Sequence, residues 1–260
     1  MIGTAWGMHM CKQKSVSLGS LLLVTLFFVP AVLANTDSHP RAVSLSFVEG
    51  TVIARRPGSP NWARAALNMP IEEGVSIATA RHSFAEVQFE DGSTVRVGEL
   101  SRVDFMQMGS APHSGYVNHL NLAVGFATIN IISKRHDEYV LTASGASLLP
   151  HGKTEFRADL SHSHLRVEVF KGRVQAADSS RSAQLGRNQV LACDYSARSD
   201  FHVTDTIQMD AWDRWVKMRD RQASLAAYSV PAPGMYDWEN GLMPFGGMGQ
   251  LPAALAEDGF

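Results

Sequence analysis

Apolar and polar residues alternate along residues 84–105, and this is the clearest pattern in the chain. Apolar side chains lie on both sides of the dipeptide Asp91-Gly92, at Phe84, Val87, Phe89, Val95 and Val97. Alternation with a period of two places one face of a strand inward and the other in water. Asp-Gly tolerates the positive φ angles that a tight hairpin turn requires. The pattern therefore predicts an antiparallel hairpin with one buried face, followed by a short strand from Leu100 to Phe105.

Short strands separated by turn residues are predicted throughout residues 44–193. Turn signals that contain glycine recur at short intervals, as in Pro57-Gly58 and His151-Gly152. The predicted strands are Ser44–Val48, Thr51–Arg55, Gly74–Ala78, Phe84–Glu90, Thr94–Val97, Leu100–Met106, Val117–Ala123, Phe126–Ile131, Tyr139–Ala143, Ala146–Leu149, Thr154–Leu160, His164–Phe170, Arg173–Ala177 and Gln189–Cys193. This spacing is typical of an all-β fold, with short antiparallel strands in a sandwich or a short coiled β-stack.

Three glycines, Gly50, Gly125 and Gly172, each stand between two predicted strands in a similar local sequence. We expect each to form a hairpin or a corner in which glycine adopts a backbone conformation that other residues avoid. They are separated by 75 and 47 residues, so the chain is not a regular solenoid.

The pattern changes from strands to a helix near the end of the chain. Residues 205–227 contain no Gly or Pro, and Trp212, Trp215 and Val216 follow an i, i+3, i+4 spacing that forms an apolar stripe. We predict an amphipathic helix over residues 205–227, with Asp205 or Thr206 as its N-cap. The apolar stripe packs on the β-domain in one interpretation, and in the other it fills a groove on a partner protein.

The same segment carries two pairs of opposite charges in the favourable i, i+4 order, Asp210/Arg214 and Asp213/Lys217. Residues 228–260 follow the helix, are rich in Pro and Gly, and contain no Lys or Arg. Such a composition buries too little apolar surface to offset the entropy lost on ordering, so we predict a mostly flexible tail.

The N-terminal segment has the layout of a secretory signal peptide. Lys12 and Lys14 precede an apolar run from Leu18 to Val29, and small residues ending at Ala34 offer a cleavage site. The run is nearer 12 residues than the roughly 20 that a membrane-spanning helix needs. We predict a cleaved signal peptide over residues 1–34 and a periplasmic or secreted protein. The alternative is an inner-membrane anchor with the domain facing the periplasm.

Charge and cysteine content narrow the possible functions. The 23 Lys and Arg include Lys12 and Lys14, whereas all 25 Asp and Glu follow residue 34, so the remainder of the chain has a net charge of −4. This balance argues against a nucleic-acid partner, because such proteins usually present a basic face. Cys193 is the one cysteine after residue 34, so an internal disulfide is excluded there, and we expect a small buried residue at the end of a strand.

Few residues suggest catalysis or metal binding. His162 and His164 share one side of an extended chain and could start a zinc site, but the same segment also reads as a polar turn between two strands. There is no G-x-S-x-G elbow to place a nucleophile. We therefore predict no catalytic residues, no metal site and no cofactor. Trp62 follows a turn and either caps the core or stacks on a sugar or a peptide.

The hairpin and several other segments resemble a known protein family. Residues 48–52, Trp62, residues 68–74 and the hairpin of residues 84–105 resemble a FecR-type domain, as do residues 141–156 and 169–174; the resemblance spans residues 43–195. It implies a non-catalytic envelope module that makes protein or ligand contacts. Regulatory members of the family control a sigma factor through a cytoplasmic helical domain. Only about 17 residues precede the apolar run here, so we expect no contact with a sigma factor.

Three hypotheses for the function follow from these observations. The first is a non-catalytic, periplasmic FecR-like module for protein–protein interaction, regulatory or sensory, with an envelope protein or cell-wall component as partner. The second is a module that binds cell-wall glycan or peptide. The third, a hydrolase or metalloenzyme, requires polar side chains that converge in one pocket. The candidate interaction surface consists of Trp62, Trp212 and Trp215.

Overall fold

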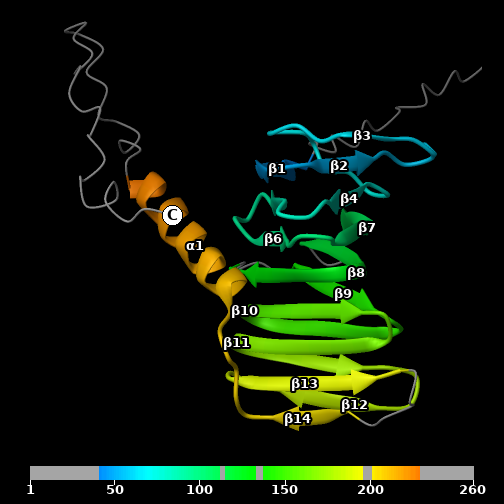
Figure 1. Cartoon of the computed structure of the whole chain (residues 1–260), viewed down its shortest axis with the longest axis vertical. Helices are drawn as coiled ribbons and strands as arrows, with labels where there is room; N and C mark the ends of the chain where they lie inside the picture. Colours follow the sequence, from blue (N-terminus) through cyan, green and yellow to red (C-terminus); the bar gives the residue numbers. More distant parts are fainter. Residues whose placement is uncertain (1–40, 112–114, 133–136, 196–200, 229–260) are drawn as a thin grey trace, which may run out of the picture. The chain divides into compact units, whose positions relative to one another are not determined.

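The computed structural model describes residues 41–111, 115–132, 137–195 and 201–228 (Figure 1). Within these ranges the chain forms fourteen strands and one helix. They are β1 (Ser44–Glu49), β2 (Val52–Arg55), β3 (Trp62–Arg64), β4 (Ser76–Thr79), β5 (Phe84–Gln88), β6 (Thr94–Val97), β7 (Arg102–Ser110), β8 (Tyr116–Ile131), β9 (Glu138–Ala143), β10 (Ala146–Ser161), β11 (His164–Ala177), β12 (Ser182–Leu185), β13 (Gln189–Asp194), β14 (His202–Thr204) and α1 (Ala211–Tyr228). The prediction of an all-β fold followed by one helix is confirmed.

The strands pair into one continuous sheet that folds over into two layers. Layer A has the order β3-β2-β4-β7-β8-β9-β10-β11-β12, and layer B has the order β1-β5-β6-β8-β10-β11-β13-β14. Strands β8, β10 and β11 belong to both layers, because one half of each pairs in layer A and the other half in layer B. Figure 1 shows these strands stacked one above another along the unit. The predicted sandwich is therefore the observed architecture.

The long strands change layer at the predicted glycine corners. Gly125 in β8 has φ +85°, and a Cβ atom there would lie 2.1 Å from Ser101 Oγ. Gly172 in β11 has φ +77°, and its Cβ would lie 2.5 Å from the carbonyl oxygen of Lys153. Positive φ and this close approach leave glycine as the residue that fits. The sequence predicted two separate strands around each of these glycines. In the structure each pair forms one bent strand, β8 or β11.

The core lies between the inner faces of the two layers. In the β5–β6 hairpin, Ala85 faces Val97 and Val87 faces Val95, and all four side chains are fully buried. The predicted hairpin is thus confirmed. The cluster of buried apolar residues between the layers contains no residue of α1. The helix is therefore an addition to a core that the strands complete among themselves.

The structure differs from the sequence prediction in its shortest elements. Strands β3, β12 and β14 were not predicted; they have three or four residues and lie at sheet edges, where an alternating pattern has little length to develop. The helix begins at Ala211 instead of residue 205. The predicted signal peptide and flexible tail lie outside the described residues. Among those that are described, no helix has the length and apolar character needed to cross a membrane.

Candidate functional site

The candidate site is the contact between α1 and the outer face of layer B, which we call the α1 seam. It begins at the N-terminus of the helix. The backbone N–H of Asp213 donates to the side chain of Asp210 at 3.0 Å, and the backbone N–H of Asp210 donates to the side chain of Asp213 at 3.0 Å. This reciprocal arrangement is a capping box, with Asp210 as the N-cap.

The N-cap prediction of Asp205 or Thr206 was therefore wrong. Asp205 instead accepts hydrogen bonds from the side chains of Asn188 at 2.6 Å and Gln189 at 2.8 Å. These contacts tie the segment before α1 to the turn that precedes β13. The helix starts only after this attachment ends, so the first residues of the Gly- and Pro-free segment lie outside it.

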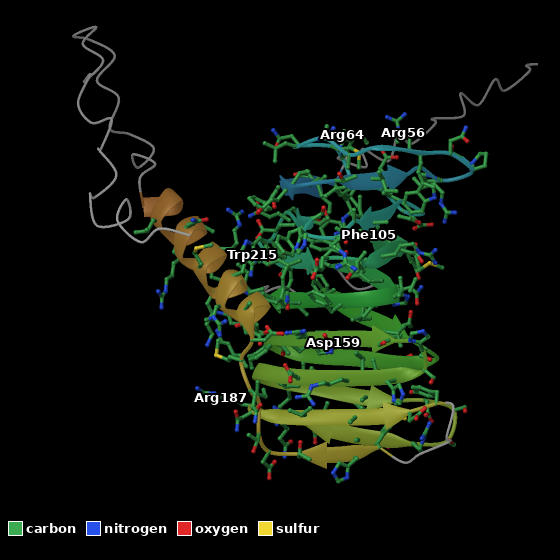
Figure 2. All side chains as sticks on the ribbon, viewed as in Figure 1. Arg56, Arg64, Phe105, Asp159, Arg187 and Trp215 are labelled. Atoms are coloured by element: carbon green, nitrogen blue, oxygen red, sulfur yellow. The ribbon has the colours of Figure 1, made fainter. Side chains whose placement is uncertain are left out.

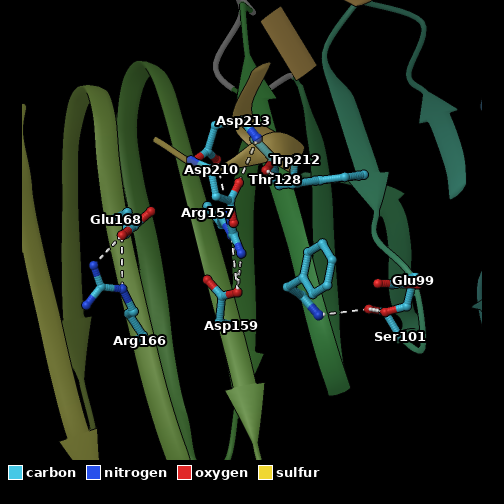
Figure 3. A network of polar contacts seen from close by, with 11 residues as sticks. Glu99, Ser101, Thr128, Arg157, Asp159, Arg166, Glu168, Asp210, Trp212 and Asp213 are labelled. Carbon is cyan, nitrogen blue, oxygen red and sulfur yellow. Dashed lines mark hydrogen bonds and ion pairs between the residues drawn. The ribbon is translucent and has the colours of Figure 1, made fainter. Parts of the chain in front are cut away.

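Aromatic side chains form the centre of the α1 seam. Trp212 stacks on Trp215 with ring centroids 4.8 Å apart, and its ring lies 5.2 Å from Phe126 and 5.5 Å from Phe84. Trp215 also contacts Phe47 at 5.6 Å. Trp212 is 6% exposed and donates its indole N–H to Thr128 Oγ1 at 2.8 Å (Figure 3). Burial with a satisfied donor is the usual environment of a packed tryptophan.

Arg157 on β10 joins the sheet to the start of the helix. Its guanidinium lies 2.7 Å from Asp159, 2.8 Å from Asp210 and 3.2 Å from Asp213, and these contacts converge in Figure 3. Burial opposes the charge on Arg157, but the neighbouring carboxylates outweigh burial and raise its pKa. Asp210 and Asp213 thus bind Arg157 across the seam, in place of the predicted pairs with Arg214 and Lys217 along the helix.

A second charged cluster lies further along the helix. Arg96 on β6 contacts Glu86 at 2.6 Å and Asp220 of α1 at 2.7 Å, and Arg219 of α1 contacts Glu86 at 3.0 Å. Arg96 is only 2% exposed. Burial opposes ionisation of Glu86, but the contacts with Arg96, Ser46 and Arg219 together lower its pKa. The carboxylate is therefore held ionised beneath the helix.

The structure separates the three predicted tryptophans. Trp212 and Trp215 lie together in the α1 seam, whereas Trp62 lies on β3 of layer A, half-buried beneath the guanidinium of Arg55 at 5.1 Å. Trp212 is buried in this arrangement and Trp215 is half-buried. Whether these residues contact a partner stays a prediction. Sequence reasoning missed Glu86, Arg96 and Arg157, since each occupies the outward position of an alternating strand and resembles an ordinary solvent-facing charge.

The other candidate residues lie elsewhere. His162 forms the turn between β10 and β11 with φ +54°, and His164 pairs with Asp194 at 3.5 Å. Among the described residues, no three His, Cys, Asp or Glu side chains are placed to hold a metal ion; His113 and His136 lie outside them. Cys193 is 4% exposed within β13, which confirms the prediction of a buried residue at the end of a strand.

The fold and the seam define an all-β sandwich module with a docked C-terminal helix. Residues 75–175 match the model of the protein family described as "FecR protein". The match includes Glu86, Arg96 and Arg157 but ends before α1. It supports a regulatory or sensory module that acts through protein contacts.

Other comparisons add little to this identification. Two crystal structures from Parabacteroides distasonis ATCC 8503, at 2.50 Å and 1.65 Å resolution, are each described as a "putative anti-sigma factor". They share 13% and 12% identity with this chain, with a TM-score of 0.44 in both cases. The aligned part covers 50% of this chain and 59% of theirs. A search of curated proteins found no match.

Proposed function

We propose that this protein is a non-catalytic regulatory module in which α1 covers a partner-binding face on layer B. The observation that carries the proposal is the composition of the α1 seam, in which buried ion pairs surround a small aromatic cluster. A buried ion pair is often no more stable than a well-packed apolar pair of similar volume. Such a contact is not the most stable way to attach a helix permanently. Its specificity suits a helix that can be replaced by a partner.

The outer face of layer B, once α1 has left it, is also suited to binding a partner in place of the helix. When α1 leaves, Glu86, Arg96 and Arg157 return to water, where their charges are well solvated. The sheet face then presents fixed charges around Phe47, Phe84 and Phe126. A partner helix with acidic residues and one or two aromatic residues would match this face as α1 does.

We further propose that the module works in the periplasm on an envelope protein, and that it makes no contact with a sigma factor. The FecR match over residues 75–175 supports an envelope role, and the apolar run that follows Lys12 and Lys14 supports export. The domain organisation is then a signal peptide over 1–34, the β-domain over 43–195, the helix and a tail over 228–260.

The experiment is photo-crosslinking in intact cells with the full-length chain. A crosslinking amino acid replaces Phe47, which lies under α1, or Gln107, which is exposed on layer A and serves as the matched control. We expect one envelope protein to be captured from position 47 and not from position 107. Capture of that protein equally from both positions, or from neither, would contradict the proposed face.

A cell-wall glycan is the second candidate ligand, and layer A provides the observation that favours it. Six cross-strand neighbours form a polar row with a tryptophan at one end, in which Ser76 is buried and the others are partly exposed: Trp62, Arg55, Ser76, Asp104, Asn121 and Thr142. Rings that stack and side chains that hydrogen-bond are the two contacts sugars need. Binding to purified cell wall that disappears in Trp62→Ala and persists in Trp215→Ala would support this role.

A further inference from the structure

A cavity of about 500 Å³ lies at the end of the α1 seam nearest the helix N-terminus. Its walls come from four parts of the chain: β10, the layer-changing corner of β11, the turn before β13, and α1 with the segment that leads into it. Figure 2 shows Arg187 on the side where the chain passes from β14 to α1. The volume is within the usual range of small-molecule sites.

Three basic side chains from separate elements meet at this cavity. Lys171 comes from the corner of β11, Arg187 from the turn before β13, and Lys217 from the second turn of α1. Within the described residues, Lys171 and Arg187 make no ion pair or hydrogen bond through their side chains, and Lys217 donates only to the sulfur of Met209, at 3.0 Å. Each cation thus remains available to a ligand.

One carboxylate, Glu155, lies in the same lining. Burial raises its pKa, the charge of Asp220 adds to that effect, and the charges of Arg96, Lys217 and Lys171 oppose it. Lys171, Lys217 and Glu155 line the same cavity. With Glu155 ionised, the lining carries three positive charges and one negative charge, which leaves a net charge of +2.

Asn188 adds a polar amide to the lining, and the remaining wall consists of the apolar side chains Phe170, Ile207 and Met209. We propose that this cavity binds a small organic anion that carries two negative charges and an apolar group, and that the bound anion holds α1 on layer B. Charge-assisted contacts to the three cations fix the anionic end, and the apolar end covers Phe170 and Met209. Because Lys217 belongs to α1 while Lys171 and Arg187 belong to the sandwich, one ligand links the two.

The effect of the bound anion on α1 rests on the proposed function. The proposal that the cavity binds an anion does not depend on that function. A ligand that binds only while α1 is docked stabilises the docked state by mass action. At a ligand concentration of ten times Kd, opening of α1 becomes about tenfold rarer. The ligand would thereby keep the partner face of layer B covered.

The test uses the full-length chain and three probes at pH 7.5 and low salt. Phenyl phosphate carries the dianion and a ring, inorganic phosphate carries the charge alone, and benzyl alcohol carries the ring alone. We expect calorimetry to give the tightest binding for phenyl phosphate and weaker binding as salt rises. Amide exchange in α1 should slow by about tenfold at ten times Kd.

Matched variants test the assignment. Lys171→Gln combined with Arg187→Gln should weaken binding of phenyl phosphate by at least about tenfold, whereas Glu155→Gln should tighten it, because an opposing charge is removed. Arg173→Gln removes an exposed charge from the same strand outside the cavity and should change Kd by less than about twofold.

Three results would overturn the inference. Absence of phenyl phosphate binding at millimolar concentration would refute the site, as would equal effects of the double variant and Arg173→Gln. Binding without slower exchange in α1 would refute the link to the helix. Crosslinking from position 47 needs no ligand, so failure of the proposed function would be seen separately.

Discussion

Replacing Trp212 by alanine is expected to release α1 from the sandwich without unfolding the sandwich. The change removes a ring that is 94% buried, its contacts with Phe84, Phe126 and Trp215, and a hydrogen bond to Thr128. Deleting a large buried aromatic side chain costs about 3–5 kcal/mol. An isolated helix of 18 residues is marginal in water, so docking is what keeps α1 ordered.

Hydrogen exchange measured by mass spectrometry tests this prediction directly. If exchange in α1 occurs through undocking, a loss of about 3–5 kcal/mol makes it faster by about 10²- to 4 × 10³-fold. Amides in β6 and β13 should keep their protection, because the core between the layers contains no residue of the helix. The stability lost in Trp212→Ala therefore cannot exceed the free energy with which α1 docks on the sandwich.

Two controls separate docking from general damage. Trp215→Ala removes a ring that is only half-buried, so it should accelerate exchange in α1 less than Trp212→Ala does. Trp62→Ala, on layer A, should leave exchange in α1 unchanged. Unchanged exchange in α1 of the Trp212→Ala protein would refute the reasoning, as would an equal acceleration in β6 and α1.

The remaining predictions concern charge and backbone. Arg157→Met should reduce the free energy of docking of α1 by about 3 kcal/mol, because Asp213, whose side chain is 3% exposed, loses its partner. Adding Asp213→Asn should recover part of that loss in the same exchange assay. The lowered pKa of Glu86 means that its contribution to stability is present above the ordinary value of 4.5 and is lost as the pH falls through the lowered value; urea unfolding at several pH values should show this loss, and Glu86→Gln should reduce it. Gly125→Ala should destabilise the whole sandwich by about 2–4 kcal/mol, seen in urea unfolding, because φ is +85° and a Cβ meets Ser101; Gly145→Ala, with φ +86° and no atom within 4 Å of the added Cβ, should cost about 1–2 kcal/mol and so isolates the close contact.

Most of the fold was predictable because its signals are local. The β5–β6 hairpin follows from alternation around Asp91-Gly92, and its inward residues Val87, Val95 and Val97 are fully buried. The corners at Gly125 and Gly172 follow from glycine between two strand patterns. Which strands continue through a corner was not predictable, because a glycine between two strand patterns occurs both in a bent strand and in a turn between two separate strands.

The site was much harder to predict because it depends on contacts between distant residues. Arg96 lies 124 residues from Asp220, and Arg157 lies 56 residues from Asp213. The sequence does identify Trp212 and Trp215 as the apolar stripe of a helix. It does not indicate which sheet face receives them, because layers A and B both present alternating polar residues outward.

Under the proposed function, the outward charges on layer B explain how one strand pattern can serve both a docked and an open state. Alternation places Glu86 on β5 and Arg96 on β6 where water would normally solvate them, and in the docked state Asp220 and Arg219 take the place of that water. An outer face made of leucine and valine would hold α1 more tightly, but it would expose an aggregation-prone surface whenever the helix left. A face of paired charges with a few aromatic rings tolerates both states. The sequence pattern of an exposed strand is therefore compatible with the proposed opening and closing of α1, and amide exchange in α1 of the unaltered protein measures how far the balance lies toward the closed state.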